Sequence, residues 1–140
     1  MKFTSLALAL SLGLLAACRP GATDPKTNEF VLKESEIPSG LPLPTLVYEF
    51  DGNKFSNTAK IIEEHTSATG QRFLVYGFTT SIATASRADL ALYFKGRSAG
   101  QDQWIVRWDV DGVTGEKDFI YATGTELDLV DTNKLKVKVK

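Results

Sequence analysis

The stretch that decides the fold is Gln103-Trp104-Ile105-Val106-Arg107-Trp108-Asp109-Val110-Asp111-Gly112. Tryptophan or valine occupies every second position of it, from Trp104 to Val110. Successive side chains of a strand point to opposite faces, so this period places both tryptophans on one face. The Asp-Gly pair that follows supplies the positive φ angles of a tight hairpin turn. The stretch therefore predicts a strand and a turn of an antiparallel sheet.

The same alternation recurs along residues 45–140. Further strands are predicted at residues 46–50, 73–78, 89–95 and 134–140, and the run 73–78 is apolar on both faces, as in a central strand. Turn signals lie at residues 51–53, 68–71, 96–100 and 111–115. Short strands at this spacing predict a mainly β fold, a small antiparallel β-sandwich or barrel of seven to nine strands.

Two segments leave an α+β alternative open. Residues 57–65 could form a short helix capped by Ser56 or Asn57. Residues 83–92 are rich in Ala, Arg and Leu, which favour helices. If either segment is helical, the fold has a helix laid on an antiparallel sheet.

The prolines mark an internal boundary. All five precede residue 45, so we interpret residues 18–44 as a mostly extended tether and residues 45–140 as one β-rich globular domain. Residues 29–33 are an exception, which could add a short strand or pack against the domain. The alternative is that the proline-containing stretch is the first loop of the domain. A core of 96 residues can fold without disulfides.

Residues 1–17 have the parts of a secretory signal peptide. Lys2 is the only charge before Cys18, and residues 3–17 are apolar or small. The run is shorter than the roughly 20 residues that a transmembrane helix needs, and Arg19-Pro20-Gly21 ends it. We therefore expect residues 1–17 to direct export.

The end of this leader, Leu15-Ala16-Ala17-Cys18, resembles a bacterial lipobox. The resemblance implies cleavage before Cys18, a diacylglycerol thioether on its sulfur and an acylated amine. The membrane would then be a partner through the lipid anchor on Cys18. Arg19 stands where an Asp would favour inner-membrane retention, so outer-membrane attachment is implied for a Gram-negative source.

Composition excludes several classes of partner and cofactor. Without residues 1–17, which hold one lysine and no acid, fifteen basic residues face seventeen acidic ones, a net charge of about −2. Nucleic-acid binding needs clustered Lys and Arg, so no nucleic acid is expected. The only cysteine is Cys18 and the only histidine is His65, too few ligands for zinc. We expect no metal and no cofactor.

No catalytic constellation is found. His65 adjoins Glu63 and Glu64, where a solvated histidine is the simpler interpretation than a general base. There is no Gly-x-Ser-x-Gly motif, so the sequence predicts no enzyme. Asp109-x-Asp111-Gly112 has the carboxylates of a calcium loop, but its spacing fits a hairpin turn better.

Trp104 and Trp108 are candidate ligand-binding residues, because exposed aromatics can form a sugar-binding platform. The sequence favours a core role instead, since Val106 and Val110 share their face. The alternating lysines of residues 134–140 suggest the solvent face of an edge strand rather than contact with anionic lipids.

The sequence thus predicts a lipid-anchored bacterial envelope lipoprotein with a β-rich interaction or structural domain and a protein partner in the envelope. The alternative is a lipoprotein that binds a small molecule, a sugar or a lipid. A large internal cavity or an exposed tryptophan pair would favour the alternative.

Overall fold

The computed structural model describes residues 29–129 and 132–140. The chain divides into two units, residues 1–31 and residues 32–140. Only residues 29–31 of the first unit are described, so the signal peptide and Cys18 lie outside the described residues. The second unit carries the fold that follows.

The second unit is mainly β, as the sequence predicts. Its elements are β1 (Leu32–Lys33), the 3-10 helix η2 (Glu34–Glu36), β2 (Thr45–Phe50), β3 (Asn53–Thr58), β4 (Lys60–Thr66), β5 (Arg72–Ala83), β6 (Arg87–Ser98), β7 (Gln101–Val110), β8 (Val113–Ile120), β9 (Glu126–Leu127) and β10 (Leu135–Val139). These are ten strands among the described residues, two of them only two residues long, against the seven to nine expected.

The helical alternative is wrong for both ambiguous segments. Residues 57–65 belong to β3 and β4, which are interrupted at Ala59, and residues 87–92 belong to β6. Ile61 and Ile62 are β-branched and pack well on a pleated surface. In addition, β4 pairs with β5 along its whole length. Pairing with neighbouring strands therefore overrides the local helix preference of these segments.

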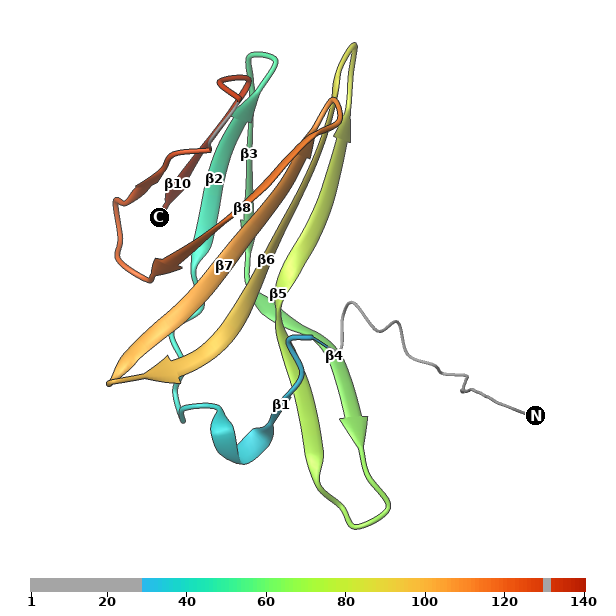
Figure 1. Ribbon diagram of the computed structural model, residues 1–140, viewed down its shortest axis with the longest axis vertical. Coiled ribbons are helices and arrows are strands. Elements are labelled where there is room, and N and C mark those ends of the chain that lie inside the picture. The colour runs from blue at the N-terminus through green and yellow to red at the C-terminus, as the bar shows by residue number, and fades with distance from the viewer. Residues whose placement is uncertain (1–28, 130–131) are drawn as a thin grey trace, which may run out of the picture. The chain divides into compact units, whose positions relative to one another are not determined.

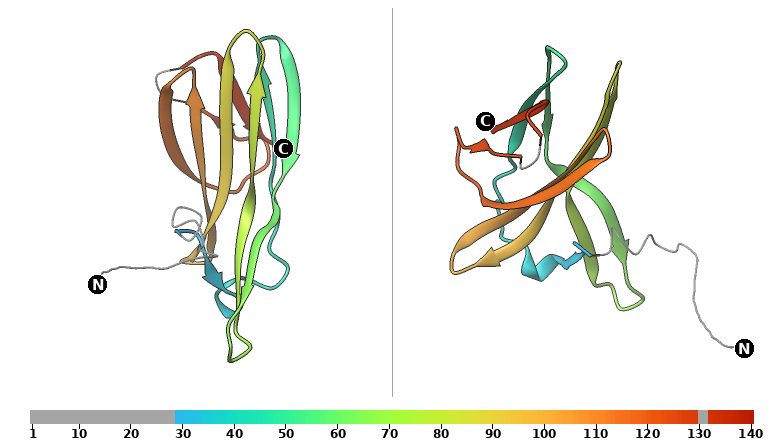
Figure 2. Two further views of the ribbon diagram at one scale, coloured as in Figure 1. Left: turned by 90° about the vertical axis from the view of Figure 1, so that its right-hand side faces the viewer. Right: turned by 45° about the horizontal axis from the view of Figure 1, so that its top comes forward.

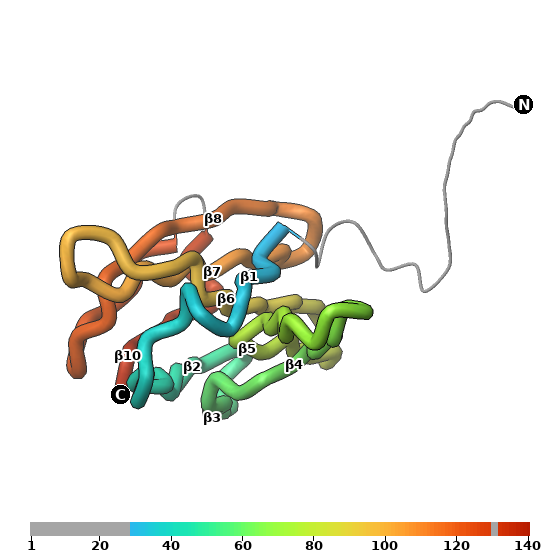
Figure 3. Tube along the Cα trace, turned by 90° about the horizontal axis from the view of Figure 1, so that it is seen from below, coloured from blue at the N-terminus to red at the C-terminus, as the bar shows by residue number. Residues whose placement is uncertain are grey.

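The strands form two antiparallel sheets. The six-stranded sheet has the order β1-β5-β6-β7-β8, with β4 also paired to β5, and the four-stranded sheet has the order β3-β2-β10-β9. Figures 1 and 3 show the two sheets as separate layers of residues 32–140. The six-stranded sheet is strongly curled (Figure 2), and the hairpin of β4 and the first half of β5 projects from it (Figure 1).

Two-residue turns connect three pairs of neighbouring strands. In Asp111-Gly112 the φ angles are 51° and 89°, and Asp51-Gly52 and Ala99-Gly100 have similar values. Two successive positive φ angles define the turn whose twist matches that of the flanking strands. The Asp-Gly turns confirm the hairpins predicted from the sequence.

The core lies between the inward faces of the two sheets. It contains aromatic and aliphatic side chains from β2, β5, β6, β7, β8, β9 and β10, with Trp104 fully buried and Trp108 exposed by only 4%. Leu32 of β1 packs against this core, and β1 pairs with β5 through Leu32 and Leu74. Residues 32–33 belong to the stretch 29–33 that the sequence set apart from the tether as a possible short strand, and they do contribute a strand to the sheet.

The position of β10 corrects one expectation. The alternating lysines suggested an edge strand, but β10 lies between β2 and β9 inside the four-stranded sheet. Its valines face the core while Lys136 and Lys138 are exposed on the outward face. A sheet with one solvated face gives the same alternation in a central strand as at an edge, so the pattern alone does not distinguish the two.

Candidate functional site

The candidate histidine lies on an exposed strand. His65 is on β4, opposite Phe73 of β5, and its side chain is 42% exposed. Its Nε2 is hydrogen-bonded to Glu63 Oε2, two residues away on the same strand. Neither of the two surface depressions described below includes His65. The pair therefore has the geometry of a solvated surface contact.

Trp104 and Trp108 are inside the core. Their indole Nε1 atoms are buried and have no hydrogen-bond partner among the described residues. The ring of Trp104 packs against that of Phe94, with the ring centroids 5.0 Å apart. A platform for sugars requires exposed ring faces, and Trp104 and Trp108 are buried in the core between the sheets.

The carboxylates of the Asp109–Asp111 stretch serve the hairpin turn. Asp109 Oδ1 accepts a hydrogen bond from the Gly112 N–H at 2.9 Å. Asp111 Oδ1 accepts one from the Arg87 N–H at 2.9 Å, and Asp111 Oδ2 lies 3.0 Å from Lys134 Nζ. The hydrogen bond from the Arg87 backbone, followed by the contact with Lys134, lowers the pKa of Asp111. No group of three or more potential metal-ligating side chains occurs in the described part of the chain.

The smaller of the two surface depressions, with a volume of about 430 Å³, lies beside this turn. Asp111, Val113 and Lys134 are among the residues that line it. Because Lys134 and Asp111 are already paired with each other, this depression offers no free charged group. It does not form a candidate site.

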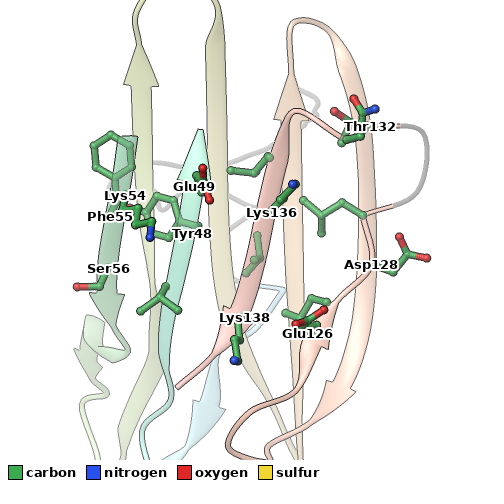
Figure 4. Close-up of a pocket in the computed structure, with 16 residues that line it drawn as sticks. Tyr48, Glu49, Lys54, Phe55, Ser56, Glu126, Asp128, Thr132, Lys136 and Lys138 are labelled. Carbon is green, nitrogen blue, oxygen red and sulfur yellow. The ribbon is translucent and has the colours of Figure 1, made fainter. Parts of the chain in front are cut away.

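The strongest candidate is an open groove on the outward face of the four-stranded sheet, which we call the β2–β10 groove. Its volume is about 980 Å³. Residues of β2 and β10 form its floor, while residues 54–56 of β3 form one wall and residues 126–129 and 132–133 the other. Figure 4 shows Lys136 and Lys138 on β10 between Glu49 of β2 and the acidic wall with Glu126 and Asp128.

Strand pairing sets the positions of the charged groups in this groove. Glu49 lies directly opposite Lys54 on one side and Lys136 on the other. In the next outward row, Val47 lies opposite Ser56 and Lys138, and Lys138 lies opposite Glu126. Basic and acidic residues thus alternate across neighbouring strands.

These charged side chains are not paired with one another. None of the groove's six charged residues takes part in an ion pair within residues 29–129 and 132–140; they are Glu49, Lys54, Glu126, Asp128, Lys136 and Lys138. On the six-stranded sheet, by contrast, Lys95 Nζ lies 2.7 Å from Asp118 Oδ2. The groove therefore presents three lysines and three carboxylates that keep their charges available to a partner.

Sequence reasoning missed this site. Its floor consists of residues 47–49 paired with residues 136–138, which are far apart in the sequence. No pattern of neighbouring residues predicts that pairing. The alternating lysines of residues 134–140 were the one sequence signal that pointed to this surface, because they indicate that this strand has a solvated face.

The described residues include no helix long and apolar enough to cross a membrane. In comparisons with known proteins, no family model, no curated protein and no solved structure matches the chain.

Proposed function

We propose that this protein is a lipid-anchored bacterial envelope lipoprotein whose β domain is an interaction module, with the β2–β10 groove as its docking surface. The observation that carries the docking role is the set of unpaired charges in an open groove of about 980 Å³. Charged groups that complement those of a partner give a protein interface its specificity and speed its association.

The anchor rests on the lipobox at Leu15–Cys18. A single acyl chain gives only marginal membrane binding, at about 0.8 kcal/mol for each buried methylene, so several chains on one cysteine make the attachment effectively permanent. Arg19 after the cysteine favours the outer membrane in a Gram-negative source. The partner of the groove would then be a component of the envelope.

Binding of a sugar or lipid is the second candidate function. An aromatic platform or an interior cavity would favour it, but Trp104 and Trp108 are buried and large apolar side chains occupy the space between the sheets. What supports the interaction module over this alternative is that the hollow lies on the outward face and that six of its sixteen lining residues are charged.

The anchor is tested by mass spectrometry of the protein extracted from membranes. We expect a chain that begins at Cys18 with a diacylglycerol thioether and an acylated amine. The Cys18→Ser variant should lose membrane attachment. An intact Met1 terminus, or a Cys18→Ser protein that still partitions wholly with membranes, would contradict the anchor.

The docking role is tested separately by placing a photo-cross-linking amino acid at position 138, in the groove, or at position 60, an exposed lysine of β4. In living cells, position 138 should give a discrete cross-linked product and position 60 should not. Equal products from both positions, or none from position 138, would contradict an interaction through the groove.

A further inference from the structure

Resting on this docking role, we infer that the β2–β10 groove binds an extended polypeptide segment that carries both acidic and basic side chains. The inference specifies the chemistry of the partner from the arrangement of charges in the groove and from the spacing of its rows.

Oppositely charged neighbours in the groove do not pair with each other. Lys136 and Glu49 are direct neighbours on β10 and β2, yet they form no ion pair. On the other sheet, Arg107 Nε lies 3.0 Å from Glu116 Oε1 of the neighbouring strand. Five of the six charged groove residues are exposed and Glu49 is half-buried, so their charged ends remain accessible to groups of opposite charge.

The charges of the groove favour a partner that carries both signs. The three lysines and three carboxylates of the groove sum to zero. A polyanion would meet Glu49, Glu126 and Asp128 at close range, and a polycation would meet the three lysines, so each would be repelled by half of the surface. A ligand with both signs can pair with Lys136 and Glu49 at once.

The spacing of the outward side chains favours a partner in an extended conformation. Outward residues of one strand, such as Lys136 and Lys138, recur every second residue, which is about 6.6–6.8 Å in an antiparallel strand. An extended peptide has the same two-residue repeat, so successive side chains on one of its faces meet successive rows of the groove. A helix rises 5.4 Å per turn and loses this register within a few turns.

The test uses the full-length protein purified in detergent and three fluorescent synthetic peptides of twelve residues. In each peptide threonine alternates with a charged residue: Glu and Lys in turn in the mixed peptide, Glu alone in the second and Lys alone in the third. Fluorescence anisotropy at low and high salt measures binding. We expect the mixed peptide to bind about tenfold more tightly than either single-sign peptide, and salt to weaken its binding.

Variants then locate the binding site. Lys136→Glu should weaken binding of the mixed peptide about tenfold, and Lys136→Gln should weaken it less. Lys60→Glu is the matched control, because it makes the same charge change on an exposed strand outside the groove, and it should leave binding unchanged. Circular dichroism of each variant shows that it is folded.

Three results would overturn the inference. One is tighter binding of a single-sign peptide, and another is no binding of the mixed peptide. The third is a dimer, seen by light scattering, that Lys136→Glu abolishes, since the occupant would then be a second copy of the chain. A groove that binds no peptide but still gives the cross-link from position 138 would remove only the peptide inference, whereas loss of both would remove the docking role as well.

Discussion

Trp108 lies directly opposite Gly115 in the pairing of β7 with β8, and its indole covers the place where Gly115 has no side chain. A Cβ atom on Gly115 would lie 2.4 Å from Trp108 Cζ2 and 2.6 Å from Cε2, closer than real Cβ contacts. Glycine inside a strand often marks such a close approach. The core at β8 is therefore completed by a side chain from β7.

Replacement of this glycine should destabilise the domain. Gly115→Ala should lower the free energy of unfolding by about 1–3 kcal/mol, because the added methyl group forces the indole to move. Alanine is otherwise favoured over glycine within a strand, by roughly 0.5–1 kcal/mol, so the sign of the change is diagnostic. Urea denaturation measures it. Thr114→Ser, on the outward face of the same strand, should stay within about 0.5 kcal/mol of the parent. A stabilised Gly115→Ala protein would show that the indole does not occupy this space.

The two tryptophans should behave as core residues. Trp104→Ala and Trp108→Ala should each cost roughly 3–5 kcal/mol, the usual loss for a buried large aromatic side chain. The fluorescence of the folded parent should resist quenching by iodide, because both rings are shielded from solvent. Mutants that melt within a degree or two of the parent, together with easy quenching, would instead favour the ligand platform.

Asp111 should make stability depend on acidity. Its pKa is lowered in the folded state from an ordinary value of 3.8, chiefly by the Arg87 N–H and then by Lys134. Below about pH 4 the unfolded chain binds more protons at this site than the folded chain, so stability falls as the pH falls. Asp111→Asn should thus be less stable than the parent at pH 6, and this difference should shrink as the pH falls below about 4. Urea denaturation at several pH values measures it, and a difference that stays constant over this range would contradict the assignment.

The start of the domain remains a prediction that truncation can test. The sequence places it near Thr45, while β1 pairs with β5 and the Ala59 N–H donates to the Pro44 carbonyl at 2.9 Å. We expect a chain that begins at Thr45 to unfold cooperatively but at a lower temperature than a chain that begins at Leu32. Calorimetry compares the two. A chain from Thr45 without a cooperative transition would move the boundary to β1 or earlier.

Local features of the sequence predicted local features of the structure. The period of two at Trp104–Val110 and the Asp-Gly pairs gave the strand, its buried face and its turn, because each depends on a few adjacent residues. The fold class followed from repeating this pattern. Both tryptophans are buried, as expected from the apolar Val106 and Val110 on the same face of the strand.

Features that depend on distant pairing could not be predicted in this way. The position of β10 between β2 and β9 decides that Lys136 lies beside Glu49, and hence that the groove exists. Nothing near Lys136 in the sequence specifies that neighbour. The helical propensity of residues 83–92 was misleading for the same reason, since pairing of β6 with β5 and β7 determines their conformation.

The order of the strands also governs when the domain can finish folding. β10 follows the other described strands along the chain, yet it lies inside the four-stranded sheet, where Val139 pairs with Leu46 near the start of β2. Contacts so distant in sequence form slowly, because a long loop must close before they stabilise the chain. A nascent chain in which β10 has not yet been made lacks the strand that joins β2 to β9. For the exported lipoprotein proposed above, the four-stranded sheet would then close only once β10 is available for pairing.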